Sequence, residues 1–431
     1  MKIKITPDLK AIPNYEEGFR IIRISLTAPV ISEIKGRDPL NLGLVIDRSG
    51  SMGGDKIRKV KDASKFIVDH LNGDDRISIV SYSDSSSTHI KSMLCTAGNK
   101  GLIKSTIEEI YPSGTTNLSD GWLTGSKLVA ASMNDSINHV FLLSDGLANA
   151  GITNLEELGL HSAELAKRGV RTSTFGVGLG FNEFLMAEIA NRGQGYDEFI
   201  ESPDQIRKTF LENIEELFHI SSKNVSLAIN VPNGVEVEVQ GRWEVITSKK
   251  STKILLGNFI SEEKRNVFVE LKIPEDKLDK EIIFKLSSEL ENKVQNIKRS
   301  IKFSRVDRNQ YKSLKRNQNV IDQYTDVKVG DLSSKALHMY QDGDRKGAKD
   351  YIASQIENSR KNFSVSGINR LEQEKLRMET NLSQRDMKES LTVNQSAMRS
   401  TNRREIIKKC PHNIPLSKDC KKCISENKPL R

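Results

Sequence analysis

The 431-residue chain has few cysteines and no long apolar run. Three of its four cysteines lie in the last 22 residues, which argues against a disulfide framework and for a reducing compartment. No apolar stretch approaches the roughly 20 residues that a membrane-crossing helix needs. The first residues, MKIKITPDLK, lack the apolar core of a secretory signal. We therefore expect a cytoplasmic protein without membrane insertion.

Positive charge is concentrated toward the C-terminal end. From residue 301 to residue 431 there are 28 Lys and Arg against 16 Asp and Glu, whereas the first 300 residues carry a net charge of about −3. A basic tail on a mildly acidic body suits nucleic acid, an anionic membrane surface or an acidic protein. It also describes a solvated, partly disordered tail, and charge alone leaves these alternatives open.

Residues 37–222 alternate between strand-like and helix-like segments. Continuous apolar runs such as LNLGLVID and NHVFLLSDG are separated by amphipathic stretches such as KIRKVKDASKFIVDHL. Strands that are buried on both faces and alternate with helices predict a mostly parallel sheet covered by helices. We therefore place a doubly wound, Rossmann-like α/β domain at residues 37–222.

The rest of the chain follows other patterns. Residues 223–306 alternate apolar and polar side chains, as in VEVEVQG and NVFVELKIP, which predicts a small antiparallel β-sandwich. The strand-like residues 1–36 are expected to join that sandwich, so that the α/β domain is inserted within it. Residues 307–408 are expected to be helical, with two helices that turn at Gly343. Their inner face would comprise Ala336, Tyr340, Ala348 and Ile352.

Oxygen-bearing side chains recur in three loops of the α/β domain. The set comprises Asp47, Ser49 and Ser51 in DRSGSM, Thr115 or Thr116 in PSGTTN, and Asp145 in LLSDG. The carboxyl edge of such a sheet is where ligands bind, and all three loops would open there. Carboxylate and hydroxyl oxygens of low total charge suit Mg²⁺. Helix capping explains a single D-x-S-x-S motif equally well, but it does not explain three such loops.

These loops resemble the metal-ion-dependent adhesion site of von Willebrand factor A domains. DRSGSM, GTTN and LLSDG stand in the family's order, and TFGVGLGFNEFLMAEIANRGQGYDEFIESPDQI is similar to the family's closing strand–helix–strand. With the β segment that follows, the chain also resembles bacterial cytoplasmic relatives, calcium-activated chloride channel regulators and inter-alpha-trypsin inhibitor heavy chains. The resemblance implies that the metal ligands are Asp47, Ser49, Ser51, Thr116 and Asp145. Thr116 is preferred because it directly precedes Asn117, as in the family's G-T-N pattern.

This resemblance implies binding rather than catalysis. Five side chains would leave at least one coordination position of Mg²⁺, Mn²⁺ or Ca²⁺ to water, which an Asp or Glu of a partner protein can displace. No His or Cys stands beside these loops in the sequence to act as base or nucleophile. We expect a non-enzymatic, metal-dependent adaptor or scaffold. Arg48, Asp84 and Asp120 near the loops are interpreted as surface or turn residues.

A second metal site is predicted at the C-terminal end. Cys410, His412, Cys420 and Cys423 form a C-x-H-x7-C-x2-C pattern, and zinc accepts Cys₃His sets in tetrahedral geometry. We expect a structural Zn²⁺ knuckle at residues 409–431, with redox-active thiols or no site as the alternatives. Cys95, alone in a strand-like stretch, is expected to be buried packing.

Two other functions stay open. The basic C-terminal region and its zinc knuckle would suit a nucleic-acid-associated factor, although the knuckle lacks the interleaved aromatic residues of a base-stacking surface. The α/β domain would also suit a regulatory subunit of an AAA+ ATPase or of a kinase or phosphatase system. The sequence identifies neither the partner nor the oligomeric state.

Overall fold

A computed structural model of the chain describes residues 1–30, 37–134, 136–275, 281–290, 293–360, 362–380 and 382–399. The chain divides into two compact units. The α/β unit comprises Glu33–His219, and the β/helical unit combines Met1–Ser32 with Ile220–Arg431. The α/β unit therefore interrupts the other unit in sequence.

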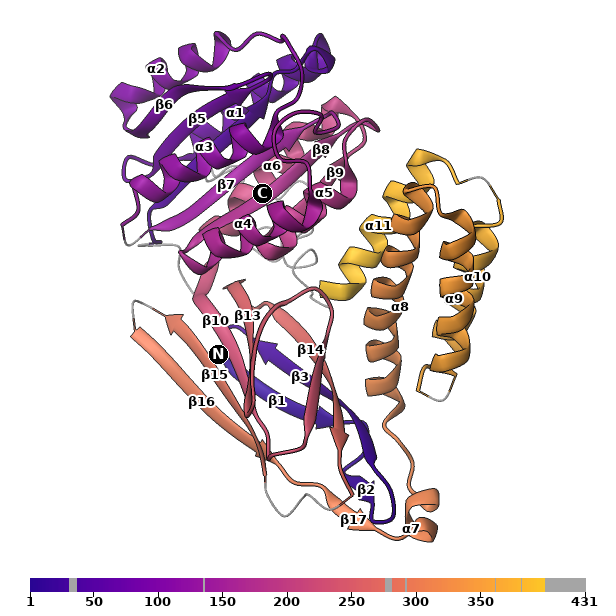
Figure 1. Cartoon of the computed structure of the whole chain (residues 1–431). Helices are drawn as coiled ribbons and strands as arrows, with labels where there is room; N and C mark the ends of the chain where they lie inside the picture. The colour runs from indigo at the N-terminus through magenta and orange to yellow at the C-terminus, as the bar shows by residue number, and fades with distance from the viewer. Residues whose placement is uncertain are drawn as a thin grey trace, which may run out of the picture. The chain divides into compact units, whose positions relative to one another are not determined.

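The α/β unit is built on a six-stranded mixed sheet with the order β6-β5-β4-β7-β8-β9 (Figure 1). Its strands are β4 (Leu40–Asp47), β5 (Arg76–Tyr82), β6 (Ser86–Leu94), β7 (Ile137–Ser144), β8 (Val170–Val177) and β9 (Gln194–Ile200). Neighbouring strands are parallel except for β5 and β6. Strands β4, β7 and β8 are buried along their whole length, as parallel strands covered on both faces must be. The predicted doubly wound α/β fold is confirmed.

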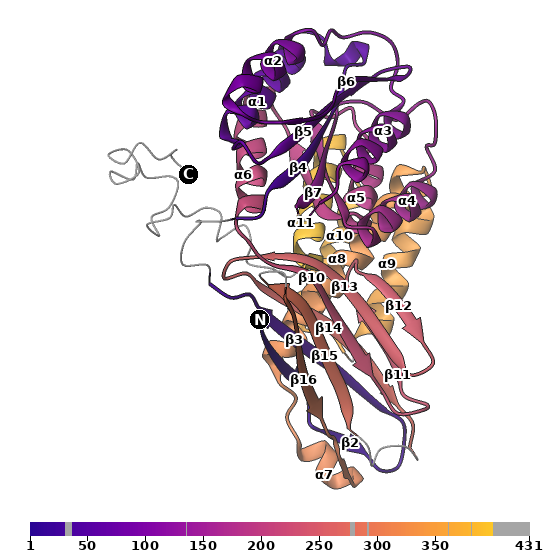
Figure 2. The same ribbon diagram turned by 90° about the vertical axis from the view of Figure 1, so that its left-hand side faces the viewer.

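Helices cover both faces of this sheet (Figure 2). Helices α3, α4 and α5 lie on one face, and α1 and α6 lie on the other, where α2 packs against α1. Their bounds are α1 (Asp55–His70), α2 (Ala97–Glu108), α3 (Leu118–Ala131), α4 (Leu155–Lys167), α5 (Glu183–Arg192) and α6 (Ile206–Phe218). Beneath α3 and α5, the sheet and the helices share one apolar cluster that includes Val80, Trp122, Leu142 and Leu185. This packing holds the loops at the strand ends in place.

The β/helical unit contains two antiparallel sheets, with the orders β1-β3-β14-β11 and β12-β13-β10-β15-β16. The first comprises β1 (Lys2–Pro7), β3 (Gly18–Thr27), β14 (Lys264–Ile273) and β11 (Glu236–Gln240). The second comprises β12 (Glu244–Ser248), β13 (Ser251–Ile260), β10 (Ile220–Asn230), β15 (Ile282–Leu290) and β16 (Lys293–Ile301). One apolar cluster takes side chains from both sheets, among them Ile24, Val269, Leu227 and Phe284.

Strands from the start of the chain pair with strands that follow the α/β unit. Strand β3 pairs with β14, and the short β2 (Ala11–Pro13) runs parallel to β17 (Ser304–Val306). These pairings bring segments together that lie more than 200 positions apart in the sequence. Their backbone hydrogen bonds make the N-terminal segment part of the β/helical unit.

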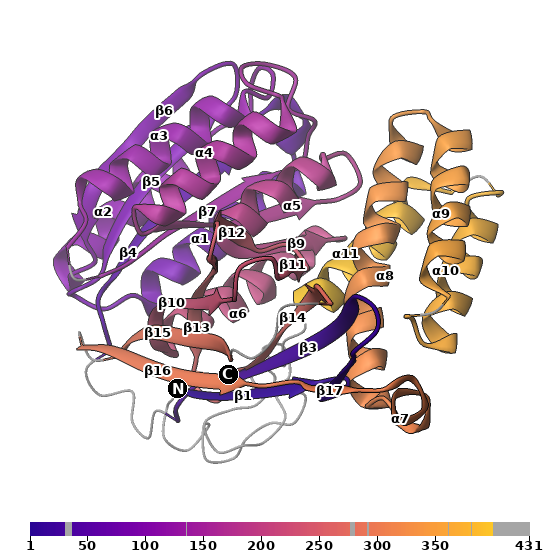
Figure 3. The same cartoon turned by 60° about the horizontal axis from the view of Figure 1, so that its bottom comes forward.

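A group of helices follows these sheets in sequence (Figure 3). They are α7 (Arg308–Ser313), α8 (Gln318–Gln341), α9 (Arg345–Ser359), α10 (Val365–Arg377) and α11 (Gln384–Arg399). Helix α8 packs against α9, α10 and α11, and its Tyr324 contacts the cluster formed by Ile21 and Phe268 of the first sheet. Gly343 has φ 93° and joins α8 to α9. The predicted inner-face residues Ala336, Tyr340, Ala348 and Ile352 are all buried.

Candidate metal-binding site

The candidate site lies at the carboxyl edge of the six-stranded sheet. Strands β4 and β7 are adjacent and parallel, so Asp47 at the end of β4 comes next to Ser144 at the end of β7. The Ser144 hydroxyl donates a hydrogen bond of 2.8 Å to Asp47 Oδ2. The loop before α3 reaches the same edge, where the Gly114 carbonyl accepts from Gly50 N at 3.1 Å. The three predicted loops therefore meet at one place.

Asp47 is held rigidly and out of water. Its side chain is fully buried, and its Oδ1 accepts from the backbone N–H of Ser49 at 2.8 Å. Burial raises the pKa of Asp47 above its ordinary value of 3.8, while the hydrogen bonds from Ser49 and Ser144 act in the opposite direction. Without a cation nearby, the charged carboxylate is therefore costly. A bound cation would offset that cost.

Ser49, Ser51 and Asp145 form a continuous row of oxygens. The hydroxyl oxygens of Ser49 and Ser51 are 3.1 Å apart, and the Ser51 hydroxyl donates to Asp145 Oδ1 at 2.7 Å. The row is built by the short turn Gly50–Met52, whose Met52 side chain is buried and anchors it. Alternate positions of the D-x-S-x-S segment thus place their hydroxyls together.

Thr116, rather than Thr115, faces this row. A Cβ added to Gly146 would lie 3.2 Å from Thr116 Oγ1 and 3.6 Å from Ser51 Oγ, so both hydroxyls border the space beside Gly146. The Thr115 hydroxyl instead donates to Asp84 Oδ1 at 2.6 Å. Glycine at position 146 keeps that space open, because a side chain would press on Thr116.

Lys56 belongs to the site and was not predicted. Its Nζ lies 2.5 Å from Asp145 Oδ2 and 3.4 Å from the Ser51 carbonyl oxygen, and its side chain is 32 % exposed. Lys56 is the second residue of α1, which begins directly after the serine loop. The first turn of a helix lies beside the loop that leads into it. The place of Lys56 at the start of α1 is therefore the one feature of the sequence that indicates its position near the site.

The side chains present fit a divalent cation. All the candidate ligands are oxygens, which suit Mg²⁺, Mn²⁺ or Ca²⁺. Together with Lys56, the carboxylates of Asp47 and Asp145 give the site a formal charge of −1. Across the described ranges no three His, Cys, Asp or Glu side chains come together as a metal site. A cation at this edge would therefore depend on hydroxyl oxygens as well as carboxylates.

The other acidic and basic residues near the loops have structural partners. Asp84 accepts from the backbone N–H and the hydroxyl of Thr115, and these hydrogen bonds lower its pKa. Arg48 donates to the Ser113 hydroxyl, and Asp120 accepts from Ser86 N at 2.6 Å. These contacts fasten neighbouring loops to one another.

The cysteines and the histidine of the predicted zinc knuckle, Cys410, His412, Cys420 and Cys423, lie outside the described residues. Cys95, in contrast, is buried as predicted. Burial raises the pKa of its thiol to about 12, so the thiol is protonated at neutral pH.

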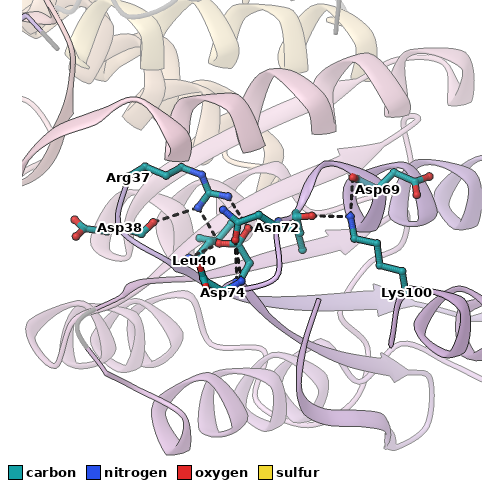
Figure 4. Close-up of polar contacts among 9 residues, drawn as sticks. Arg37, Asp38, Leu40, Asp69, Asn72, Asp74 and Lys100 are labelled. Carbon is teal, nitrogen blue, oxygen red and sulfur yellow. Dashed lines mark hydrogen bonds and ion pairs between the residues drawn. The ribbon is translucent and has the colours of Figure 1, made fainter. Parts of the chain in front are cut away.

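A second polar cluster lies at the opposite, amino edge of the sheet (Figure 4). Buried Asp75 accepts from Arg37 through both carboxylate oxygens, at 2.8 and 2.5 Å, and from the backbone N–H groups of Leu40 and Asn72. The Arg37 guanidinium also lies 4.1 Å from the centre of the Phe218 ring, at the end of α6. Every oxygen of Asp75 is engaged, so this cluster stabilises the fold.

The fold and the loops define a doubly wound α/β domain with an oxygen-lined site at the carboxyl edge of its sheet. Residues 41–220 match the family model of the von Willebrand factor type A domain. The chain therefore contains a domain of this family, in agreement with the resemblance found in its sequence.

Relatives with similar sequences come from bacteria and animals. The chain is 25% identical over 269 residues to the uncharacterized protein sll0103 of Synechocystis, covering 58% of this chain and 61% of that protein. It is 25% identical over 227 residues to mouse inter-alpha-trypsin inhibitor heavy chain H2, covering 48% of this chain and 24% of that protein. The chain thus spans less than two thirds of the length of these relatives.

The architecture of both units is also found in a solved structure. A von Willebrand factor type A protein from Catenulispora acidiphila aligns with a TM-score of 0.72 over 93% of this chain and 96% of that chain. Sequence identity is 13%, so this likeness concerns the fold. Within the described residues, no helix combines the length and apolar character of a membrane-crossing segment.

Proposed function

We propose that the α/β unit binds one divalent cation, Mg²⁺ or else Mn²⁺ or Ca²⁺, through Asp47, Ser49, Ser51, Thr116 and Asp145. The observation that carries this proposal is the row of oxygens from Ser49 through Ser51 to Asp145, with Asp47 and Thr116 beside it. Two carboxylates and neutral hydroxyls surround the ion incompletely, so at least one coordination position remains for an exchangeable ligand.

That exchangeable ligand is an Asp or Glu side chain of a partner protein. A carboxylate is the hard, anionic ligand that an incompletely neutralised divalent cation prefers. Domains of this family often mediate protein–protein interactions, which supports the same conclusion. The chain then acts as a metal-dependent adaptor or scaffold in the cytoplasm, and it binds its partner without chemical turnover.

A pull-down in four conditions tests this function. The 431-residue chain, as wild type and as Asp47→Ala, is immobilised and incubated with native lysate in Mg²⁺ or in EDTA. We expect a partner to be retained only by wild type in Mg²⁺. Asp69→Ala serves as the control, because Asp69 is an exposed aspartate that pairs with Lys104 on the helical surface. A partner retained in all four conditions would contradict the proposal.

Lys56 is expected to compete with the cation. Its ammonium must leave Asp145 Oδ2 before both oxygens of that carboxylate can serve a metal. Because the pair is partly exposed, we expect Lys56→Gln to raise Mn²⁺ affinity by about two- to fivefold in an electron paramagnetic resonance titration. Lys59→Gln is the matched control: Lys59 is on the same helix, is 34 % exposed and pairs with Asp204. Equal or weaker binding by Lys56→Gln would show that Lys56 supports the ion instead.

The zinc knuckle at residues 409–431 stays a prediction from the sequence. Within this proposal it provides a second docking element on the basic tail, separate from the cation of the α/β unit. Zinc content measured by atomic emission on wild type and on a Cys420→Ser, Cys423→Ser double variant distinguishes a bound zinc from free thiols.

A further inference from the structure

Two exposed leucines stand beside the candidate metal site. Leu147 is 58 % exposed and follows Gly146, whose position borders the hydroxyls of Thr116 and Ser51. Leu179 is 42 % exposed and lies in the loop between β8 and α5. Single exposed leucines are common on protein surfaces. These two differ because both belong to loops at the carboxyl edge of the sheet.

The two loops are in contact with each other at Asp145. A Cβ added to Gly180 would lie 2.7 Å from the backbone oxygen of Asp145. The loop that contains Leu179 therefore packs against Asp145, which follows the end of β7. On its other side, a Cβ added to Gly178 would lie 4.0 Å from Lys56 Cε. The two glycines that flank Leu179 therefore lie next to Asp145 and Lys56.

The loop that carries Leu147 is also fixed in place. Asn149 accepts from Thr116 N through its side chain at 3.0 Å and donates to the Thr116 carbonyl at 3.2 Å. Two residues further on, Gly151 has φ 72° and packs so closely on Asn117 that a Cβ would lie 2.2 Å from its side-chain oxygen. Leu147 is thus exposed on a loop that is already ordered by hydrogen bonds and packing. A partner that covers Leu147 therefore pays a smaller cost in conformational entropy.

We propose that Leu147 and Leu179 form an apolar shelf that selects a partner segment in which a large apolar residue stands next to the metal-binding Asp or Glu. This inference rests on the proposed function, because the acid is brought to the site by the cation. The charge of the surroundings agrees with an acidic segment: Lys56 lies beside Asp145, and Arg48 lies between Asp47 and Ser49. A bound divalent ion would add further positive charge. The apolar neighbour then covers the leucines while the acid reaches the ion.

A peptide-display selection on the whole 431-residue chain tests this shelf. The library carries a fixed central glutamate between randomised residues, and binders are selected in Mg²⁺ and eluted with EDTA. We expect Leu, Ile, Met or Phe to be enriched at the positions next to the glutamate. For a selected peptide, Leu147→Ser or Leu179→Ser should weaken binding by about three- to tenfold. A matched peptide with glycine in place of the apolar residue should bind wild type and these variants alike.

Control measurements separate the shelf from the metal site. Leu160→Ser removes a leucine of α4 that is 57 % exposed, and it should leave peptide binding unchanged. The Mn²⁺ affinity of Leu147→Ser and Leu179→Ser should equal that of wild type, which shows that the metal site is intact. Selected peptides without an apolar preference, or unchanged binding by both variants, would overturn the shelf alone. No EDTA-eluted peptides, or peptides that bind equally well with glutamine at the centre, would overturn the proposed function and the shelf with it.

Discussion

Asp47→Asn is expected to weaken Mn²⁺ binding by more than about 100-fold. The change keeps the size of the side chain and its hydrogen bond from Ser49 N, but it removes one of the two carboxylate charges of the site. Residues that only support a metal ligand cost 10- to 100-fold in affinity when they are changed, so a ligand itself should cost more. Electron paramagnetic resonance titration with Mn²⁺ gives the affinity of wild type and variant directly.

The same variant should not destabilise the metal-free fold. Burial raises the pKa of Asp47, so the folded state holds the proton more tightly than the unfolded chain does. The free-energy cost of the charge is therefore absent at a pH below the ordinary pKa of 3.8, and it grows as the pH rises through the raised pKa. Above the raised pKa the full cost applies, and an uncharged Asn avoids it.

Thermal unfolding tests whether Asp47 is a metal ligand or only a structural residue. Wild type should unfold at a higher temperature in Mg²⁺ than in EDTA, because an ion that binds only the folded state stabilises it. Asp47→Asn should show no such difference, and its unfolding temperature in EDTA should equal or exceed that of wild type. A variant that loses stability in EDTA and keeps its response to Mg²⁺ would contradict the assignment of Asp47 as a ligand.

Asp75→Ala is expected to lower the free energy of unfolding of the α/β unit by about 3–5 kcal/mol. The side chain of Asp75 is fully buried and accepts two hydrogen bonds from Arg37 and two from backbone N–H groups. Removing it leaves the guanidinium of Arg37, which is 13 % exposed, without its carboxylate partner. This loss affects the amino edge of the sheet, where the strands begin. The metal loops lie at the opposite edge, where the strands end.

Urea unfolding followed by tryptophan fluorescence measures this loss in the right unit. The chain has two tryptophans: Trp122 is buried in the α/β unit, and Trp243 lies in the β/helical unit. In a Trp243→Phe background the signal therefore reports on the α/β unit alone. Asp74→Ala is the matched control, because Asp74 is the exposed neighbour of Asp75 (Figure 4). Equal midpoints for Asp75→Ala and Asp74→Ala would show that the Asp75 cluster contributes little.

Strand β6 shows how weak the apolar pattern of an edge strand can be. Its sequence, SSTHIKSML, places a single buried side chain, Ile90, between polar residues. It pairs with β5 through two register irregularities, so no strict alternation of apolar and polar residues appears. An edge strand covered on one side needs few apolar residues, and its pairing is set by the neighbouring strand.

Lys56 and Ser144 are residues of the site that the sequence did not predict. The motif residues Asp47, Ser49 and Ser51 are recognisable because their spacing is local. Lys56 reaches Asp145, 89 positions away, and Ser144 reaches Asp47, 97 positions away. Such partners become visible only when the parallel strands bring their ends together.

The amino-acid sequence by itself determined the α/β class of the central domain and the oxygen-rich character of its loops, because the period of apolar residues and the spacing of D-x-S-x-S are local properties of the chain. Tertiary structure alone decided the pairing of β3 with β14 and the positions of Lys56, Leu147 and Leu179 around Asp145. The physical reason is that these relations depend on strand order and loop packing. Contacts between residues distant in sequence set both, and no local pattern encodes them.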